Sequence, residues 1–396
     1  MLSTLLNRFS EPETLKMAKL ARELRSSGVD VVDLSLGEPD FDTPDHIKIA
    51  AKNAIDNNFS HYTPVAGLLD VRKTICEKFL RENQLKYVPE NIVISTGAKQ
   101  SIANLILSLV DAGDEVIIPT PYWVTYSALV ELAGGVPVYL KGSLENGFKI
   151  TADQLEKAIT PKSKLLMYSS PCNPSGALYT MEELTAFADV LKKNPQVYVM
   201  SDEIYEHINY GGIHSSMAQV PGMQDRTIII NGLSKSFAMT GWRLGYMAAP
   251  LEIAKACEKI QGQFTSGANA ITQMATIAAL NGDLTPTKQM VDAFRERRGV
   301  MLQLLLAIPG VKCPEPPAAF YLFPDVSAYF GKTAPDGTSI TNGADLSLYL
   351  LNNAHVSSVA GSAFGEDSCI RLSFANSVEN IRKGIQRIAT SLAELK

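Results

Sequence analysis

The chain of 396 residues is long enough for two domains, and its 46% hydrophobic and 19% charged residues are typical of a soluble globular protein. A net charge of −5 provides no general attraction for nucleic acid or for an anionic membrane surface. The five cysteines are scattered without a Cys-x-x-Cys pair, and no apolar run has the length of a membrane span. We therefore expect a cytoplasmic protein of bacterial type, without a signal peptide, a disulfide framework or a zinc site.

The first 90 residues contain amphipathic patterns separated by turns. They predict one short strand over 31–36 and three helices, over 11–27, 44–58 and 68–83. The strand is followed by a turn rich in helix breakers that begins at Gly37. By composition alone this is a tight turn, although a glycine here also lets a ligand approach the backbone. Tyr62 lies in a loop between two of the helices, where a lone tyrosine usually serves packing.

From residue 91 onward, strand patterns alternate with helix patterns, which indicates a parallel sheet. The strands are predicted over 92–95, 115–118, 136–140, 164–168, 197–200 and 227–230, and the helices over 100–110, 151–159 and 181–193. Gly97, Ala98 and Lys99 lead directly into the first of these helices, whose N-terminal N–H groups form an anion site. The segment matches neither a Walker loop nor a dinucleotide-binding glycine pattern, so it favours a simple phosphate over a nucleotide.

The last third of the chain changes character. A strand over 244–248 precedes helices over 252–263, 270–281 and 286–307. Beyond residue 314, short strands, a Gly/Asp/Thr-rich loop and two helices predict a smaller α+β domain. We therefore divide the chain into an N-terminal segment (1–43), a large domain (44–290) and a small C-terminal domain (291–396).

Polar and aromatic side chains follow several of the predicted strands, at the edge where open α/β sheets bind ligands. Trp123 can stack on a flat ring, although a core tryptophan is the commoner case. Asn173 offers a donor and an acceptor, although Asn-Pro is also a common turn. Asp202, three residues before Tyr205, is a carboxylate that needs a partner such as a protonated ring nitrogen, or else serves as a helix cap.

Lys235 follows the buried strand over 227–230 and lies in the stretch Asn-Gly-Leu-Ser-Lys-Ser. An amine in a partly apolar pocket has a lowered pKa and becomes a nucleophile, while Ser234 and Arg243 nearby are suited to a phosphate. A Schiff-base lysine beside a phosphate site suggests pyridoxal phosphate, whereas a surface lysine in a Ser/Gly loop is the simpler alternative. Arg371 lies in an apolar strand and requires an anion, either a substrate carboxylate or an ordinary ion pair.

These motifs, in this order, resemble the class I aminotransferases of the aspartate aminotransferase fold. The resemblance rests on Asn173-Pro174-Ser175-Gly176, Asp202-Glu203-Ile204-Tyr205, the Ser-Lys and Thr-Gly-Trp-Arg-Leu-Gly stretch over 234–245, and Arg371, and it extends from about Ser35 to about Asn376. It implies an α/β fold of the fold-type-I pyridoxal-phosphate transferases. Such a fold has a mostly parallel seven-stranded sheet between helices, with 244–248 as the one antiparallel strand, and a small α+β domain on which the N-terminal segment packs.

The resemblance also implies roles for individual residues. Lys235 would carry pyridoxal 5′-phosphate as a Schiff base and then move a proton, while Asp202 would bind the ring nitrogen. Tyr205 and Asn173 would bind the ring oxygen, and Trp123 would stack on the ring. The phosphate would be surrounded by Gly97, Ala98, Ser234, Arg243 and, from the neighbouring subunit of a homodimer, Tyr62. The substrate α-carboxylate would be held by Arg371, Asn173 and Gly37.

The substrates expected from the resemblance are an amino acid and a 2-oxo acid, exchanged in a two-step reaction. Gln261 aligns where animal-type aspartate aminotransferases have an arginine for the distal carboxylate, which counts against that mode. Lys99 and Thr14 match the bacterial and plant subgroup, in which a lysine serves instead and some members also accept prephenate. We expect transfer between aspartate and 2-oxoglutarate. The alternatives are an aromatic or alanine aminotransferase, a lyase of the same fold, or a binding protein without turnover.

Overall fold

The computed structural model of the protein describes residues 3–9 and 13–396, with the side chains of 13–16 outside the description. Its largest element is a seven-stranded sheet with the strand order β2-β8-β7-β6-β5-β3-β4. The strands are β2 (Ile92–Ser95), β3 (Glu115–Thr120), β4 (Val136–Lys141), β5 (Ser163–Ser169), β6 (Tyr198–Asp202), β7 (Thr227–Gly232) and β8 (Gly245–Ala248). Only β8 runs antiparallel to its neighbours, which confirms the predicted sheet.

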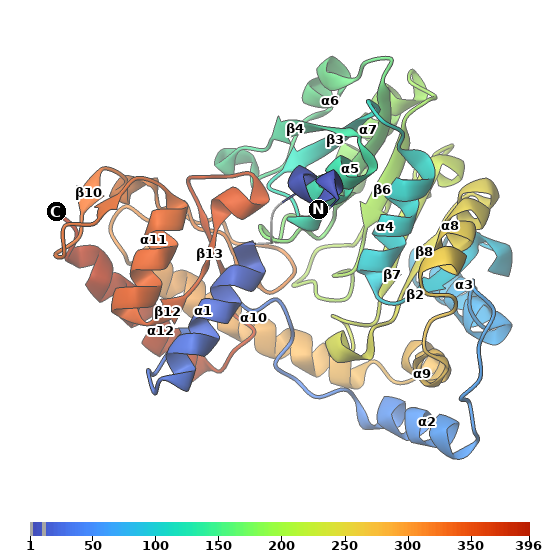
Figure 1. The fold of residues 1–396 in the computed structure, drawn as a ribbon, viewed down its shortest axis with the longest axis horizontal. Helices are drawn as coiled ribbons and strands as arrows, with labels where there is room; N and C mark the ends of the chain where they lie inside the picture. Colours follow the sequence, from blue (N-terminus) through green and yellow to red (C-terminus); the bar gives the residue numbers. More distant parts are fainter. Residues whose placement is uncertain (1–2, 10–12) are drawn as a thin grey trace.

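Helices cover both faces of this sheet, which explains why its central strands are continuous apolar runs (Figure 1). These helices are α2 (Asp45–Asp56), α3 (Leu69–Asn83), α4 (Ala98–Leu109), α5 (Thr125–Ala133), α6 (Ala152–Ala158), α7 (Met181–Lys192), α8 (Leu251–Phe264) and α9 (Ala270–Asn281). Three apolar clusters fill the spaces between the strands and these helices. The sequence patterns did not predict α5, although its Tyr126 and Val130 are fully buried.

The C-terminal part is built on short strands, shown in orange and red at the left of Figure 1. The three-stranded antiparallel sheet has the order β13-β14-β9, while β1 pairs in parallel with β12 and β10 pairs with β11. The elements are β1 (Val32–Asp33), β9 (Tyr321–Leu322), β10 (Lys332–Thr333), β11 (Ser339–Ile340), β12 (Val356–Ser357), β13 (Val359–Ala360), β14 (Ile370–Ser373), α10 (Thr285–Leu306), α11 (Gly343–Tyr349) and α12 (Val378–Ala393). The predicted α+β character of this part is therefore confirmed.

The N-terminal segment lies against this smaller part through strand β1 and helix α1 (Glu13–Ser26), which packs near β12 and β13. Met17, Ala21, Val31 and Leu351 form a small apolar cluster there. The long helix α10 runs from the sheet side to the small part (Figure 1), so the domain boundary predicted at 290 falls inside one helix. The division at 43 and 290 stays a prediction.

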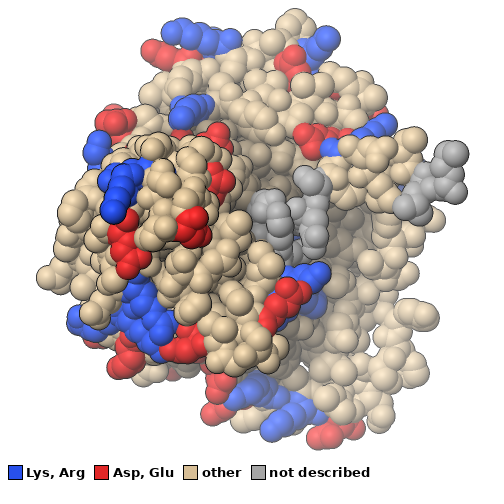
Figure 2. Space-filling model, turned by 60° about the vertical axis from the view of Figure 1, so that its left-hand side comes forward, with Lys and Arg blue, Asp and Glu red and all other residues tan. Residues whose placement is uncertain are grey.

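Surface charge does not gather on one side in the view of Figure 2, where basic and acidic side chains are intermixed. This distribution agrees with the small net charge of −5. Among the residues that the structure describes, no helix combines the length and the apolar content that crossing a bilayer requires.

Candidate active site

A cavity of about 550 Å³ lies at the carboxyl ends of the sheet strands, between the sheet and the small C-terminal part. Parallel strands bring their carboxyl ends to one edge, so residues far apart in the sequence meet there. The cavity is lined by most of the predicted site residues: Gly37, Ala98, Lys99, Trp123, Asn173, Asp202, Tyr205, Ser234, Lys235, Arg243 and Arg371. Helix α1 contributes Ala18 and Arg22 to the same cavity.

Lys235 projects into this cavity from the turn that follows β7. Its Nζ donates a hydrogen bond to the Gly37 carbonyl at 2.5 Å and lies 5.8 Å from the centre of the Tyr205 ring. Burial, together with the guanidinium groups of Arg371 and Arg243, lowers the pKa of Lys235 to about 8. About a tenth of this amine is therefore uncharged at pH 7, far more than for an ordinary lysine, and the uncharged form is the one that nucleophilic attack requires.

Asp202 ends β6 and is 5% exposed. Its Oδ2 accepts a hydrogen bond from the Tyr126 hydroxyl at 2.7 Å, and its Oδ1 accepts one from the Ile204 N–H at 3.3 Å. Burial raises the pKa of Asp202 to about 6, although the bond from Tyr126 opposes this rise. Tyr126 was missed by the sequence interpretation, because a fully buried tyrosine in an unpredicted helix carries no distinguishing signal.

A pair of tyrosines, Tyr205 and Tyr321, forms another wall of the cavity. The hydroxyls of Tyr205 and Tyr321 are 2.9 Å apart, and a Cβ added at Gly37 would come within 3.1 Å of the Tyr321 hydroxyl. Any side chain at position 37 would therefore crowd this wall. Tyr321 was also not predicted, since the strand pattern over 319–323 marks it only as apolar core.

Arg371 projects from β14 and is 3% exposed. Its Nη1 donates to the Asn173 Oδ1 at 3.0 Å and its Nη2 donates to the Ser35 carbonyl at 2.6 Å. Its Nε is buried and has no hydrogen-bond partner among the residues that the structure describes. Tyr321 and Phe364 lie against the guanidinium, at 4.5 and 5.0 Å from their ring centres. A buried guanidinium held only by neutral oxygens lacks a counter-anion.

Gly97 and Arg243 form the other end of the site, beside the first turn of α4. Gly97 has a φ of 82°, and a Cβ there would lie 2.4 Å from the Arg243 Nη2. Only glycine allows this close approach. Ser234, Arg243 and Ala98, in the first turn of α4, line the same cavity, and their role as an anion site stays a prediction.

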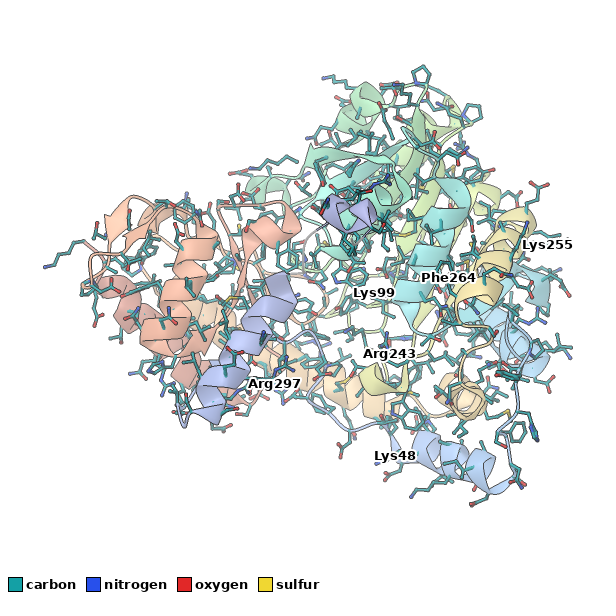
Figure 3. The ribbon with its side chains drawn as sticks, in the orientation of Figure 1. Lys48, Lys99, Arg243, Lys255, Phe264 and Arg297 are labelled. Atoms are coloured by element: carbon teal, nitrogen blue, oxygen red, sulfur yellow. The ribbon has the colours of Figure 1, made fainter. Side chains whose placement is uncertain are left out.

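Lys99 and Arg243 are labelled in Figure 3 and lie on the edge of the sheet domain that faces the small part. The Lys99 Nζ is 4.9 Å from the centre of the Trp123 ring, a cation–π distance. Partial burial, together with Arg243, lowers the pKa of Lys99. An ammonium held close to another cation in a cavity favours an anionic ligand.

Two of the residues selected from the sequence lie elsewhere, and the side chain of a third is not described. Tyr62 is 99% exposed and does not line the cavity of its own chain. Thr14 belongs to α1, but its side chain falls outside the described residues. Gln261 is fully buried, and its amide group bonds to Val65 and Ile94 carbonyls and to Asn104, so it does not reach the cavity.

Comparison with known proteins places the whole chain in one family. Residues 29–388 match the family model described as aminotransferase class I and II. The aspartate/prephenate aminotransferase of Cereibacter sphaeroides is 45% identical over 396 residues, covering 100% of this chain and 99% of that protein.

Two solved structures extend this likeness to three dimensions. The aspartate aminotransferase from Rhizobium meliloti has a TM-score of 0.97 at 40% identity and covers 100% of both chains. The aspartate aminotransferase from Thermus thermophilus with maleate has a TM-score of 0.93 at 39% identity and covers 99% of both. This chain therefore belongs to the class I and II aminotransferases and is a pyridoxal-phosphate-dependent enzyme of fold type I.

Proposed function

We propose that this protein moves an amino group between aspartate and 2-oxoglutarate in a ping-pong reaction, with prephenate as a further amino acceptor. The observation that carries the proposal is the buried guanidinium of Arg371, which has no counter-anion within the described part of the chain and lines a cavity rich in basic residues. The similar proteins named above support the choice of substrate, since their names include aspartate, prephenate and, as a bound molecule, maleate.

The residues in the cavity fit pyridoxal 5′-phosphate. Asp202 is a buried carboxyl that forms no ion pair within the described part of the chain, and a protonated pyridine nitrogen would supply the missing cation. Gly97, Ser234 and Arg243 surround a space beside the α4 N-terminus that suits a phosphate. Trp123, which lines the same cavity, would lie against the ring, and Asn173 and Tyr205 would bind its oxygen. When bound, the cofactor supplies an electron sink for the charge that develops at the substrate α-carbon.

Lys235 is the residue proposed to move the proton. With substrate and cofactor bound, its free Nζ would take a proton from the substrate α-carbon and return it elsewhere. The lowered pKa of Lys235, about 8, places it close to the operating pH, where a general base is most effective. Asp202, held by Tyr126, would keep the ring nitrogen protonated during this transfer.

Arg371 is proposed to hold the substrate α-carboxylate. Two of its nitrogens are already fixed by Asn173 and the Ser35 carbonyl, so its orientation is set before the substrate arrives. A carboxylate would provide the counter-anion that the protein itself does not supply. Gly37 leaves room beside Tyr321 for this carboxylate.

The charge lining the cavity favours a dicarboxylate. Its ionisable walls comprise five basic residues, Arg22, Lys99, Lys235, Arg243 and Arg371, and two acidic ones, Glu38 and Asp202. The phosphate and the α-carboxylate account for Arg243 and Arg371, and Lys235 carries the cofactor. Arg22 and Lys99 then remain, and we assign the distal carboxylate to Lys99, with Thr14 proposed beside it.

We also propose a homodimer located in the cytoplasm. Tyr62 is almost fully exposed although it is aromatic, and Phe264, at the end of α8, is 68% exposed. A neighbouring subunit would cover these side chains and would bring Tyr62 to the phosphate of the partner's cofactor. All five cysteines are free, which fits a reducing compartment.

A substrate panel tests the proposal. Aspartate, glutamate, alanine and phenylalanine would each be given alone to the loaded enzyme, and conversion of the cofactor to its amine form would be followed by absorbance. Oxaloacetate, 2-oxoglutarate and prephenate would then be offered as acceptors. We expect aspartate and glutamate to react with much larger kcat/KM than alanine or phenylalanine. A preference for phenylalanine or alanine, or elimination without amine transfer, would contradict the proposal.

A further inference from the structure

A fully buried ion pair lies behind the site, on the far side of the segment that carries Asp202 and Tyr205. Lys78 of α3 is 0% exposed, and its ammonium pairs with Glu206, which is 7% exposed. The Lys78 Nζ also donates to the Asn83 Oδ1 at 2.9 Å and lies 3.6 Å from the Glu82 Oε2. Two of its N–H donors therefore have hydrogen-bond acceptors, and the Glu82 carboxylate adds a second negative charge nearby, which together compensate the burial of the ammonium.

This ion pair is connected to both sides of Lys235. The Glu206 Oε1 accepts from the Asn231 Nδ2 at 2.8 Å, and Asn231 is the penultimate residue of β7, four residues before Lys235. The adjacent His207 places its Nδ1 3.0 Å from the Ser236 Oγ, directly after Lys235. The other nitrogen of His207 is 2.9 Å from the Glu82 Oε2, which returns the network to α3.

The network is not arranged to bind a metal ion. Glu82, Glu206 and His207 place possible ligand atoms within 4.8 Å of one another. However, the Lys78 ammonium already contacts Glu206 and lies close to Glu82, so the cluster contains its own cation. Burial alone would raise the pKa of Glu206, but the Lys78 ammonium and the neighbouring histidines hold this pKa well below its usual range. Glu206 is therefore ionised near neutral pH.

We propose that Lys78, through Glu206, is a positioning residue that fixes the Lys235 turn relative to Asp202 and Tyr205. Residues 202–207 carry the ring-binding side chains on one side and the network on the other, and Asn231 and Ser236 tie the Lys235 turn to the same segment. A proton transfer depends on the distance between the Lys235 Nζ and the substrate, and small displacements lower its rate sharply. The inference rests on the proposed role of Lys235.

The test removes both charges, because removal of one alone would leave the other buried without a partner. The variant is Lys78→Met/Glu206→Gln, and the matched control is Lys149→Met/Glu183→Gln, an ion pair at 2.6 Å whose residues do not line the cavity. Ser236→Ala is a milder third variant that removes only the link from His207. Thermal unfolding would verify that each variant is folded.

Two readouts separate positioning from a purely structural role. The first is capture of pyridoxal phosphate by the cofactor-free protein, measured as an affinity and as the pH at which the visible absorbance changes. We expect Lys78→Met/Glu206→Gln to weaken capture and to shift that pH, with no change in the control. The second is turnover: kcat should fall about ten- to hundredfold while KM for aspartate stays within about twofold. Ser236→Ala should show a smaller fall of the same kind.

The outcomes are distinct. A folded double variant with wild-type capture, absorbance profile and kcat would overturn the proposal, as would an equal loss in the control. If the double variant does not fold, Ser236→Ala decides, and unchanged readouts in that variant overturn it. If the proposed substrates are wrong, the capture assay still tests the positioning role, because it needs no amino acid. Failure of Lys235 as the cofactor lysine would appear separately, as unchanged visible absorbance in Lys235→Ala.

Discussion

The two walls of the cavity are built differently. On the sheet wall, the buried carboxylates accept hydrogen bonds from the protein: Asp202 accepts one from Tyr126, and Glu206 accepts from Lys78 and Asn231. The other wall is formed by the N-terminal segment and the small part. There the Arg371 Nε has no hydrogen-bond partner among the described residues, and the carbonyls of Ser35 and Gly37 accept from Arg371 and Lys235. The sheet wall is thus pre-organised for a permanent cofactor, and the opposite wall retains unmet bonding capacity for a ligand that comes and goes.

The largest effect is expected on the sheet wall, from Lys235→Ala. This change removes the only group proposed to hold the cofactor covalently and to move the proton, so turnover should fall by at least about 10⁴-fold. The visible absorbance of the covalently held cofactor should also disappear, while the thermal midpoint stays near that of the cofactor-free wild type. Normal half-reaction rates in this variant would move the catalytic role to another residue.

Arg371→Leu should give the next largest effect and tests the opposite wall. Loss of the guanidinium removes the proposed bidentate contact to the α-carboxylate. The transition-state stabilisation calculated from kcat/KM should therefore fall by about 3–5 kcal/mol for every amino acid. Cofactor capture should change little, since Arg371 belongs to the substrate wall. A loss confined to aspartate and glutamate would instead place Arg371 on the distal carboxylate.

Asp202 provides a pH test of the sheet wall in the cofactor-free protein. Its pKa of about 6, raised from 3.8, means that the folded state binds this proton more tightly than the unfolded state. The corresponding stability is present below pH 3.8 and is lost as the pH rises through 6. The loss amounts to about 3 kcal/mol, from 1.36 kcal/mol per pKa unit. Unfolding free energies of wild type and Asp202→Asn between pH 4 and 7 measure this difference.

Tyr126→Phe sharpens the same experiment. Without the hydroxyl, Asp202 loses a bond that stabilises its charged form, so its pKa should rise further and the stability loss should move to higher pH. Cofactor binding should reduce the loss in both proteins, because a protonated ring nitrogen compensates the carboxylate. An identical pH dependence in wild type and Asp202→Asn would show that Asp202 titrates normally.

Lys99→Ala is expected to cost about 2–3 kcal/mol in kcat/KM for aspartate, 2-oxoglutarate and prephenate, the scale of one charge-assisted contact. Reaction with alanine should change little, because alanine has no distal carboxylate. Initial rates with aspartate and alanine measured side by side provide the comparison. Equal losses would assign Lys99 to the cofactor or to the fold, and no loss would leave it a solvated lysine.

Tyr62→Phe should have the smallest effect, with a weakening of cofactor retention by about 1.5–3 kcal/mol, one charge-assisted hydrogen bond. Tyr62 is exposed in its own chain, so this effect requires a neighbouring subunit. Cofactor release should be measured together with the mass of the particle by light scattering. Full activity in a monomer at low concentration would exclude a shared site.

Most residues of the sheet wall could be predicted from the sequence. The apolar runs before Asn173, Asp202 and Lys235 predict buried parallel strands, and parallel strands must end at one edge, so these residues had to converge. The alternation of strands and helices likewise predicted the α/β class, and the resemblance supplied the antiparallel strand β8. These features depend on local pattern and on short connections, both of which are visible in one dimension.

Only the tertiary structure brought the remaining parts together. Ser35 is 336 residues from Arg371 in the sequence, and nothing in the local patterns around Ser35, Tyr321 and Arg371 indicates that the three residues meet. The bonds from Tyr126 to Asp202 and from Lys78 to Glu206 were equally hidden, because a buried tyrosine or helical lysine looks like core or surface until its partner is placed. The sequence determined which groups point toward the edge of the sheet, since that depends on strand periodicity. Which partners bond to these groups depends on contacts between distant parts of the chain, and only the folded structure shows them.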